Sequence, residues 1–172
     1  GGEPLVNINI VKYLSTILKQ NANNLGIDFG IELITNGLLL TEELVDFLLK
    51  CDLEWIKVTL DGDKEIHNRM KPSKNELIDG TYQIIMNNLK VLKGKVPFII
   101  GSNYNNKVKD RLPFLYDDLK KNGFRKKDIK EIAFKPILGF PGHKEKSDHH
   151  IEACTFSETD VEVFTWLTNE VK

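Results

Sequence analysis

The stretch WIKVTLDG, residues 55–62, carries the clearest structural pattern in the chain. Its apolar residues Ile56, Val58 and Leu60 alternate with polar or charged ones. A period of two is typical of a β-strand with one buried face, and an Asp-Gly pair is a frequent turn. The pattern therefore predicts a strand over residues 55–60 that ends at a turn, with three side chains on its second face: Lys57, Thr59 and Asp61.

Three further strands are expected, at about residues 31–35, 97–102 and 130–137. Helical periodicity fills the intervals, in five segments: 10–18 with Asn9 as N-cap, a run capped by Thr41, 81–92 closed by Gly94, 112–119, and 157–171 after Ser157. Strands that alternate with helices pair in parallel through right-handed crossovers. The fold class is therefore α/β, and the carboxyl ends of the strands should meet at one side of the sheet, near Thr35, Asp61, Ser102 and Leu138.

Polar residues interrupt the expected strands, whereas a sheet buried on both faces reads as a continuous apolar run. They are Lys57, Thr59, Ser102 and Lys135. This pattern favours a βα barrel with a partly wet lumen over an open doubly wound sheet. A ligand of such a barrel is expected at the carboxyl ends of the strands.

Composition limits the function classes. The chain has 172 residues, 24 Lys and Arg against 25 Asp and Glu, and a net charge of −1. This length predicts one domain, and the near-zero charge argues against a nucleic-acid partner. No apolar run approaches the ~18–20 residues of a membrane span, and no secretory signal is recognisable, so we expect a cytoplasmic protein that does not bind membranes. The distant Cys51 and Cys154 predict no disulfide or metal site, and Cys51 is expected to be a buried thiol.

Three motifs occur in a characteristic order: GGEPL at residues 1–5, TNG at 35–37, and VTLDG at 58–62 followed by EIH at 65–67. In this order, and with the alternating βα layout, residues 1–140 resemble the radical SAM enzymes, within the branch that carries a C-terminal SPASM domain. The resemblance implies that residues 1–172 are a radical SAM core domain with a partial (βα)6-type barrel. It also implies truncation at both ends, with the N-terminal strand or strands and the cluster loop before Gly1 and the SPASM domain after Lys172.

The resemblance also implies the chemistry. Enzymes of this family bind S-adenosylmethionine at a [4Fe-4S] cluster held by a CxxxCxxC loop, which precedes GGEP and is not in this sequence. They form a 5′-deoxyadenosyl radical that abstracts hydrogen, and SPASM-containing relatives act on peptides or proteins. The implied partners are thus a peptide or protein substrate and an electron donor such as flavodoxin or ferredoxin. This chain alone is expected to be inactive and to bind the cofactor weakly.

The resemblance further implies eight cofactor-binding residues and no metal ligand in this chain. Gly1, Gly2 and Glu3 would meet the methionine amino group, with the glycines offering backbone carbonyls and the glutamate negative charge. Thr59 would lie near the methionine carboxylate or the ribose, and Ser102 and Asn103 near the ribose. Two residues at strand ends, Thr35 and Asp61, complete the set. Each of these assignments has a purely structural alternative. The GGEP segment could be an ordinary glycine turn, Thr59 could simply favour a strand, and Asn103 could be a turn residue.

Two histidine-containing segments are expected to lie outside the site. His67-Asn68-Arg69-Met70-Lys71 departs from the HDxxR pattern of many relatives, because Asn replaces Asp and Lys stands at or near the Arg position. Since Lys cannot replace a guanidinium fork, this segment is expected to be a solvated loop. His143, His149 and His150 lie in a Lys-rich run without ligand spacing, so a flexible insertion is favoured over a metal site.

Two rival functions stay open at this stage. Lys57 or Lys135 could serve as a Schiff-base nucleophile in a βα-barrel lyase or aldolase, because burial lowers the pKa of a lysine. Alternatively, the chain could be a noncatalytic binding module that kept the barrel and lost its cluster. A CxxxCxxC motif encoded before Gly1 would reject the second rival.

Overall fold

The computed structural model describes residues 2–73, 80–105 and 108–136. They form a parallel sheet of four strands in the order β1-β2-β3-β4, namely Ile31–Thr35, Leu53–Thr59, Phe98–Tyr104 and Ile129–Pro136. All three strand pairs are parallel. The predicted α/β class and the parallel pairing are confirmed, with strand ends shifted by one or two residues. The expected strand end near Leu138 and the helix at 157–171 lie outside the described residues.

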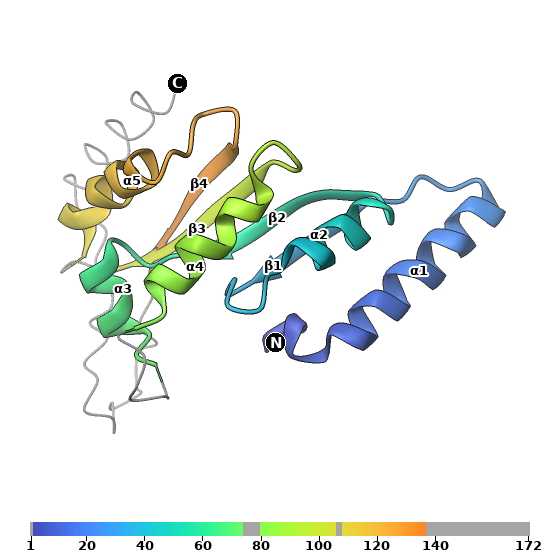
Figure 1. Ribbon diagram of the computed structural model, residues 1–172, viewed down its shortest axis with the longest axis horizontal. Coiled ribbons are helices and arrows are strands. Elements are labelled where there is room, and N and C mark those ends of the chain that lie inside the picture. Colours follow the sequence, from blue (N-terminus) through green and yellow to red (C-terminus); the bar gives the residue numbers. More distant parts are fainter. Residues whose placement is uncertain (1, 74–79, 106–107, 137–172) are drawn as a thin grey trace.

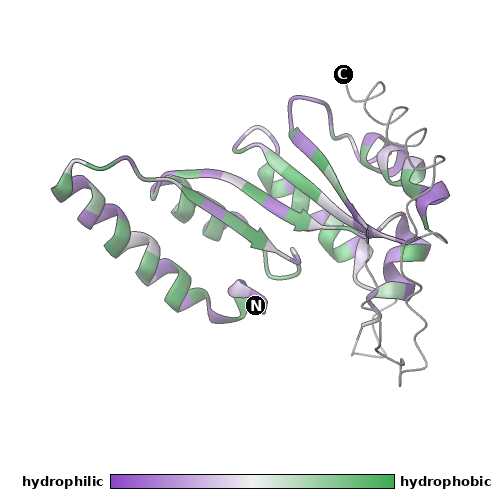
Figure 2. Ribbon diagram, turned by 180° about the vertical axis from the view of Figure 1, so that it is seen from behind, coloured by the Kyte–Doolittle hydropathy of each residue, from purple (hydrophilic) through white to green (hydrophobic). Residues whose placement is uncertain are grey.

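Among the described residues, helices cover one face of the sheet and none covers the other, which is called the open face below (Figure 1, Figure 2). The α-helices are α1 Ile8–Leu25, α2 Glu42–Leu49, α3 Lys64–Met70, α4 Tyr82–Leu89 and α5 Leu112–Lys121. Three short 3-10 turns occupy Pro4–Asn7 (η1), Lys90–Leu92 (η2) and Lys109–Arg111 (η3). Each of β1, β2 and β3 is followed by helix, as the alternating pattern predicts.

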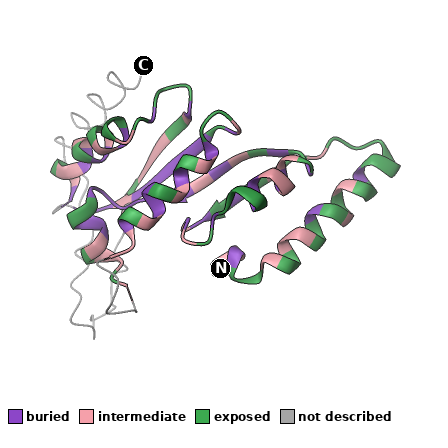
Figure 3. Cartoon of the chain, viewed as in Figure 1, coloured by how far each residue is buried: buried purple, intermediate pink, exposed green. Residues whose placement is uncertain are grey.

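The main core lies between the sheet and helices α2, α4 and α5. Alternation along the strands puts Ile56, Val58, Phe98 and Ile100 on this covered face, where all four are fully buried (Figure 3). Thr41 begins α2 as predicted, since its hydroxyl accepts a hydrogen bond from the Leu44 N–H at 3.2 Å. The Cys51 thiol is buried and free, also as expected. Cys154 lies outside the described residues.

Helix α1 differs from the prediction in its limits and in its burial. It begins at Ile8, with Asn7 at the N-cap, and its last residue is Leu25. Gly26 is the C-cap and adopts the left-handed conformation, with φ 64°. The expected apolar stripe is only partly covered, because Ile10, Leu14 and Leu18 are exposed. Instead, Lys12 and Lys19 attach the helix to Glu43 and Asp52 by ion pairs of 2.9 Å.

The largest error of the sequence prediction concerns residues 63–71, which were expected to be loop. They contain α3, and its N-cap Asp63 accepts a hydrogen bond from the Ile66 N–H at 3.1 Å. Ile66 belongs to a second small core with Tyr104, Val108 and Leu112. The helix was missed because a segment of seven residues with only two large apolar side chains, Ile66 and Met70, gives almost no periodic signal.

Gly37, in the TNG motif, tests how tightly the β1 turn packs on the core. It has φ 79°, and an added Cβ would lie 2.8 Å from Val58 Cγ1. We expect Gly37→Ala to lower the free energy of unfolding by about 2–4 kcal/mol, from left-handed strain and overpacking together. Gly94→Ala is the matched control, because Gly94 has φ 71° with open space around it. Urea unfolding of both variants should show the larger loss at Gly37, and equal losses would contradict this packing.

Candidate functional site

The carboxyl ends of the strands form the candidate site. In the strand register, Thr35 lies beside Val58, Thr59 beside Gly101, and Ser102 beside Phe134. The residues that were expected at the strand ends are therefore neighbours along one edge of the sheet. Gly1, the first residue of the expected set, lies outside the described part of the chain.

Alternation divides the expected site residues between the two faces of the sheet. Thr59 and Asn103 lie on the open face, because Thr59 pairs with Gly101 and Asn103 is two residues further along β3. Thr35 and Ser102 lie on the helix-covered face and are 3% and 1% exposed. The expectation that Ser102 contributes to the polar lumen is thus wrong, since it shares the face of the core residues Phe98 and Ile100.

Glu3 connects the GGEP and TNG motifs. Its Oε1 accepts hydrogen bonds from the Leu5 N–H at 3.1 Å and from the Thr35 hydroxyl at 2.6 Å. Its Oε2 accepts from the Asn36 N–H at 2.6 Å. Both oxygens of Glu3 therefore serve to hold η1 against the end of β1. Gly2, next to Glu3, has open space where a side chain would lie.

Asp61 connects the ends of β2 and β3. Its carboxylate is 3% exposed, and Oδ1 accepts hydrogen bonds from the backbone N–H of Asn103 at 2.7 Å and from the Asn103 side chain at 3.0 Å. Oδ2 forms an ion pair of 2.9 Å with Lys71. Next to it, the Gly62 N–H donates to the Ser102 hydroxyl at 3.1 Å. Asp61 and Ser102 thus fix the turn after β2, which accounts for their burial.

His67 is buried, so the expectation of a solvated loop here is wrong. Its Nδ1 accepts a hydrogen bond from the Asp61 N–H at 3.1 Å, and its Nε2 lies 3.1 Å from the Thr81 hydroxyl. The pKa of His67 is lowered from 6.5 to about 4, mainly by burial and also by the nearby Lys71 charge, while Asp61 opposes the shift. The ring is therefore neutral at pH 7.

Thr59 differs from the other candidates because its hydroxyl has no hydrogen-bond partner among the described residues. Within residues 2–73, 80–105 and 108–136, no group hydrogen-bonds to it, and the side chain is half-buried on the open face. Its neighbour Gly101 has no side chain, and an added Cβ there would lie 2.8 Å from Lys57 Cε. The Lys57 side chain therefore lies over Gly101. A hydroxyl at the strand ends that no described residue hydrogen-bonds fits a polar ligand, such as the cofactor that the resemblance implies.

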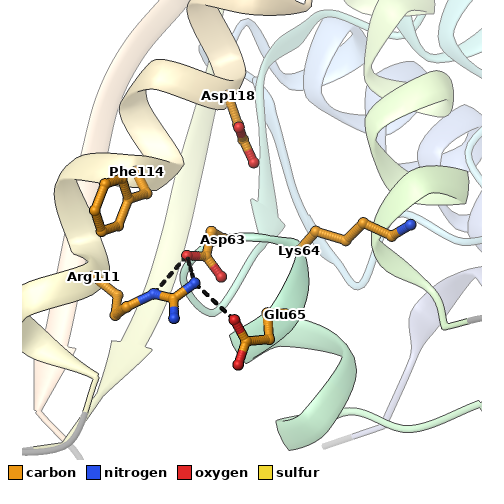
Figure 4. Close-up of a pocket in the computed structure, with 6 residues that line it drawn as sticks. All are labelled: Asp63, Lys64, Glu65, Arg111, Phe114 and Asp118. Atoms are coloured by element: carbon orange, nitrogen blue, oxygen red, sulfur yellow. Dashed lines mark hydrogen bonds and ion pairs between the residues drawn. The ribbon is translucent and has the colours of Figure 1, made fainter.

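An open surface pocket of about 520 Å³ lies between the start of α3 and helix α5. Figure 4 shows Arg111 between Asp63 and Glu65, with Phe114 and Asp118 on α5 and Lys64 directed away. Arg111 forms ion pairs with Asp63 and, at 3.0 Å, with Glu65. Sequence reasoning missed this pair, because Asp63 and Arg111 are 48 positions apart, with α3, α4 and β3 between them, and no local signal links them.

Neither a metal site nor a membrane span was found in the described part of the chain. There, no three His, Cys, Asp or Glu side chains are grouped as metal ligands. His143, His149 and His150 lie outside it. Its helices are all too short or too polar to cross a membrane.

Comparison with known proteins gives the family. Residues 1–108 match the family model described as the Radical SAM superfamily. The chain belongs to the Radical SAM superfamily. Membership in this family replaces the Schiff-base lyase reading, in which Lys57 or Lys135 would be the nucleophile.

Relatives of this radical SAM chain are longer proteins. The cysteine-type anaerobic sulfatase-maturating enzyme of Clostridium novyi (strain NT) is 30% identical over 141 residues, which cover 80% of this chain and 35% of that protein. An uncharacterized protein of Methanocaldococcus jannaschii is 28% identical over 127 residues, covering 70% of this chain and 39% of that protein. The radical SAM chain thus spans less than two fifths of either relative.

Solved structures share the fold. Native anSMEcpe with bound AdoMet has a TM-score of 0.69 and 22% identity, covering 99% of this radical SAM chain and 45% of that chain. The structure of native anSMEcpe with bound AdoMet and Kp18Cys peptide has a TM-score of 0.67 and 24% identity, covering 95% and 42%. The parallel sheet described here is therefore part of a radical SAM fold.

Proposed function

We propose that residues 1–172 form the S-adenosylmethionine-binding core of a radical SAM enzyme that modifies a peptide or protein. Membership in the family supports this, together with one observation that carries the proposal: the Thr59 hydroxyl at the strand ends, to which no described residue hydrogen-bonds. The sulfatase-maturating relative and the peptide in the anSMEcpe structure support the substrate class. The proposed electron donor is a small redox protein such as flavodoxin or ferredoxin.

The eight expected residues are assigned two kinds of role in this proposal. Thr59 and Asn103, on the open face, would contact S-adenosylmethionine, and the backbone of Gly1 and Gly2 would accept hydrogen bonds from its amino group. Asn103 would contact the cofactor beside the hydrogen bond that its side-chain amide donates to Asp61. The other four would position the turns around the cofactor through their own hydrogen bonds: Glu3, Thr35, Asp61 and Ser102. Glu3 would add negative charge beside the cofactor ammonium.

S-Adenosylmethionine, reduced at a [4Fe-4S] cluster, would supply the 5′-deoxyadenosyl radical that abstracts hydrogen from substrate. No residue of this chain is proposed as a cluster ligand. The contribution of this chain is to orient the cofactor at the strand ends and to exclude water from it by the packed β1–β3 edge.

Thr59→Val tests this proposal. The change keeps a β-branched strand former of similar shape and removes only the hydroxyl, so the fold should tolerate it. We expect 5′-deoxyadenosine formation by the cluster-reconstituted enzyme to fall ten- to a hundredfold, because a hydrogen bond to a charged group contributes about 1.5–3 kcal/mol. The melting temperature should change little.

Thr59→Ser is the matched control, since it retains the hydroxyl, and it should keep most of the activity. Unchanged cleavage in Thr59→Val would remove Thr59 from the site, and a large drop in melting temperature would make its role structural. A wild-type protein that binds S-adenosylmethionine without cleaving it would instead support the noncatalytic binding module.

A further inference from the structure

We propose that His67 is a positioning residue for the cofactor edge, acting as a neutral hydrogen-bond acceptor that holds the Asp61–Gly62 turn against β3. This inference rests on the proposed function, because it assigns His67 a role toward the same strand ends. His67 itself does not reach the open face, since it lies fully buried on α3.

The hydrogen bonds around His67 determine the state of its ring. Nδ1 faces the Asp61 backbone N–H, which can only donate, so Nδ1 must be the acceptor and carry no proton. Nε2 therefore carries the proton and donates to the Thr81 hydroxyl. The Thr81 hydroxyl in turn donates to the Lys71 carbonyl at 3.4 Å. In this series of hydrogen bonds, from the Asp61 N–H to the Lys71 carbonyl, every donor has an acceptor only when His67 is neutral.

Packing holds the ring in this orientation. His67 contacts Tyr82 on α4 edge to face, with ring centroids 5.7 Å apart. The Tyr82 hydroxyl lies 3.0 Å from Asp118 on α5 and donates to it. The imidazole is thus fixed from α4 as well as from its own helix, and its Nδ1 is directed at one backbone group.

The turn that His67 holds is linked to β3 at three points. Asp61 accepts two hydrogen bonds from Asn103, and Gly62 donates one to Ser102. Thr59 precedes this turn by two residues on β2. A shift of the Asp61 backbone would therefore displace Thr59 and Asn103, the two residues whose side chains are proposed to contact the cofactor.

Two substitutions separate acceptor loss from general destabilisation. His67→Phe keeps an aromatic ring against Tyr82 but cannot accept a hydrogen bond. His67→Asn removes most of the ring, yet its carboxamide oxygen can occupy the place of Nδ1. A merely structural role predicts that the Asn variant, which leaves a void, is at least as impaired as the Phe variant.

The measurements are the dissociation constant of S-adenosylmethionine for the cluster-reconstituted enzyme and the hydrogen exchange rate of the Asp61 and Asn103 amides. We expect His67→Phe to weaken cofactor binding roughly tenfold, the upper range for one neutral hydrogen bond, and to accelerate exchange at both amides. His67→Asn should bind within about threefold of wild type, even with a lower melting temperature.

The proposal is overturned if His67→Phe binds the cofactor as wild type does, or if the two variants lose equal affinity. If His67→Phe fails to fold, Thr81→Val against Thr81→Ser takes its place, because only Val removes the partner of Nε2; equal affinity and equal exchange in that pair would also overturn it. A wild-type enzyme that does not bind S-adenosylmethionine contradicts the proposed function instead, while amide exchange, which needs no cofactor, still tests the role of His67.

Discussion

Asp61→Ala is expected to lower the free energy of unfolding by about 1.5–3 kcal/mol, because the Asn103 backbone N–H loses its charged acceptor and a hydrogen bond to a charged group contributes about that much. The substitution leaves the Asn103 N–H without its acceptor beside a buried carboxylate site, whereas the Lys71 side chain, which is 38% exposed, can turn to water. Urea unfolding of the variant measures the loss directly.

Glu43→Ala is the matched control for this prediction. Glu43 and Lys12 also form an ion pair of 2.9 Å, but the Glu43 side chain is 85% exposed, against 3% for Asp61. An exposed pair contributes about 0–1 kcal/mol, so this control should be close to wild type. A loss at Asp61 no larger than the loss at Glu43 would show that the carboxylate does not hold the strand ends together.

Stability should also depend on the ionisation of His67. The pKa of His67 is lowered from 6.5 to about 4 in the folded chain, first by burial and then by Lys71. The unfolded state therefore binds more protons between these two values, and stability is lost as the pH falls. The stabilisation is fully present above pH 6.5, declines by about 2 kcal/mol on going from pH 7 to pH 5, and is exhausted below about pH 4.

His67→Asn provides the reference for this pH dependence, since it does not titrate while all carboxylates remain. Free energies of unfolding of both proteins are compared at pH 7 and pH 5. The wild type should lose about 2 kcal/mol more than the variant over this range. Parallel losses would mean that His67 is not held neutral in the folded state.

The strands and their parallel pairing could be predicted from the sequence because each strand carries its own signal. Alternation over residues 55–60 and the turn at Asp61-Gly62 are local properties, and helices between strands require parallel pairing. The two sides of β3 could also have been assigned by counting, since Ser102 has the parity of Phe98 and Ile100. Ser102 was expected in the lumen because it is polar. In the structure its hydroxyl accepts a hydrogen bond from the Gly62 N–H on the covered face.

The contacts that bury His67 behind the site could not be predicted from the sequence. His67 follows Asp61 closely in sequence, but its burial depends on Tyr82, Thr81 and Lys71, which reach it only through the packing of α4 on α3. Glu3 shows the opposite case, because two motifs known only by resemblance proved to be hydrogen-bonded to each other through Thr35. Motif order therefore located the site, and tertiary contacts separated residues that are free to meet a ligand from those already engaged.

The central claim, that the carboxyl ends of β1, β2 and β3 bind S-adenosylmethionine, is tested most directly by hydrogen–deuterium exchange. The cluster-reconstituted enzyme is compared with and without the cofactor. We expect slower exchange in the backbone around residues 59–62 and 101–103, with no change along α1 or the outer surface of α5. Binding of S-adenosylmethionine without protection of these strand ends would contradict the account.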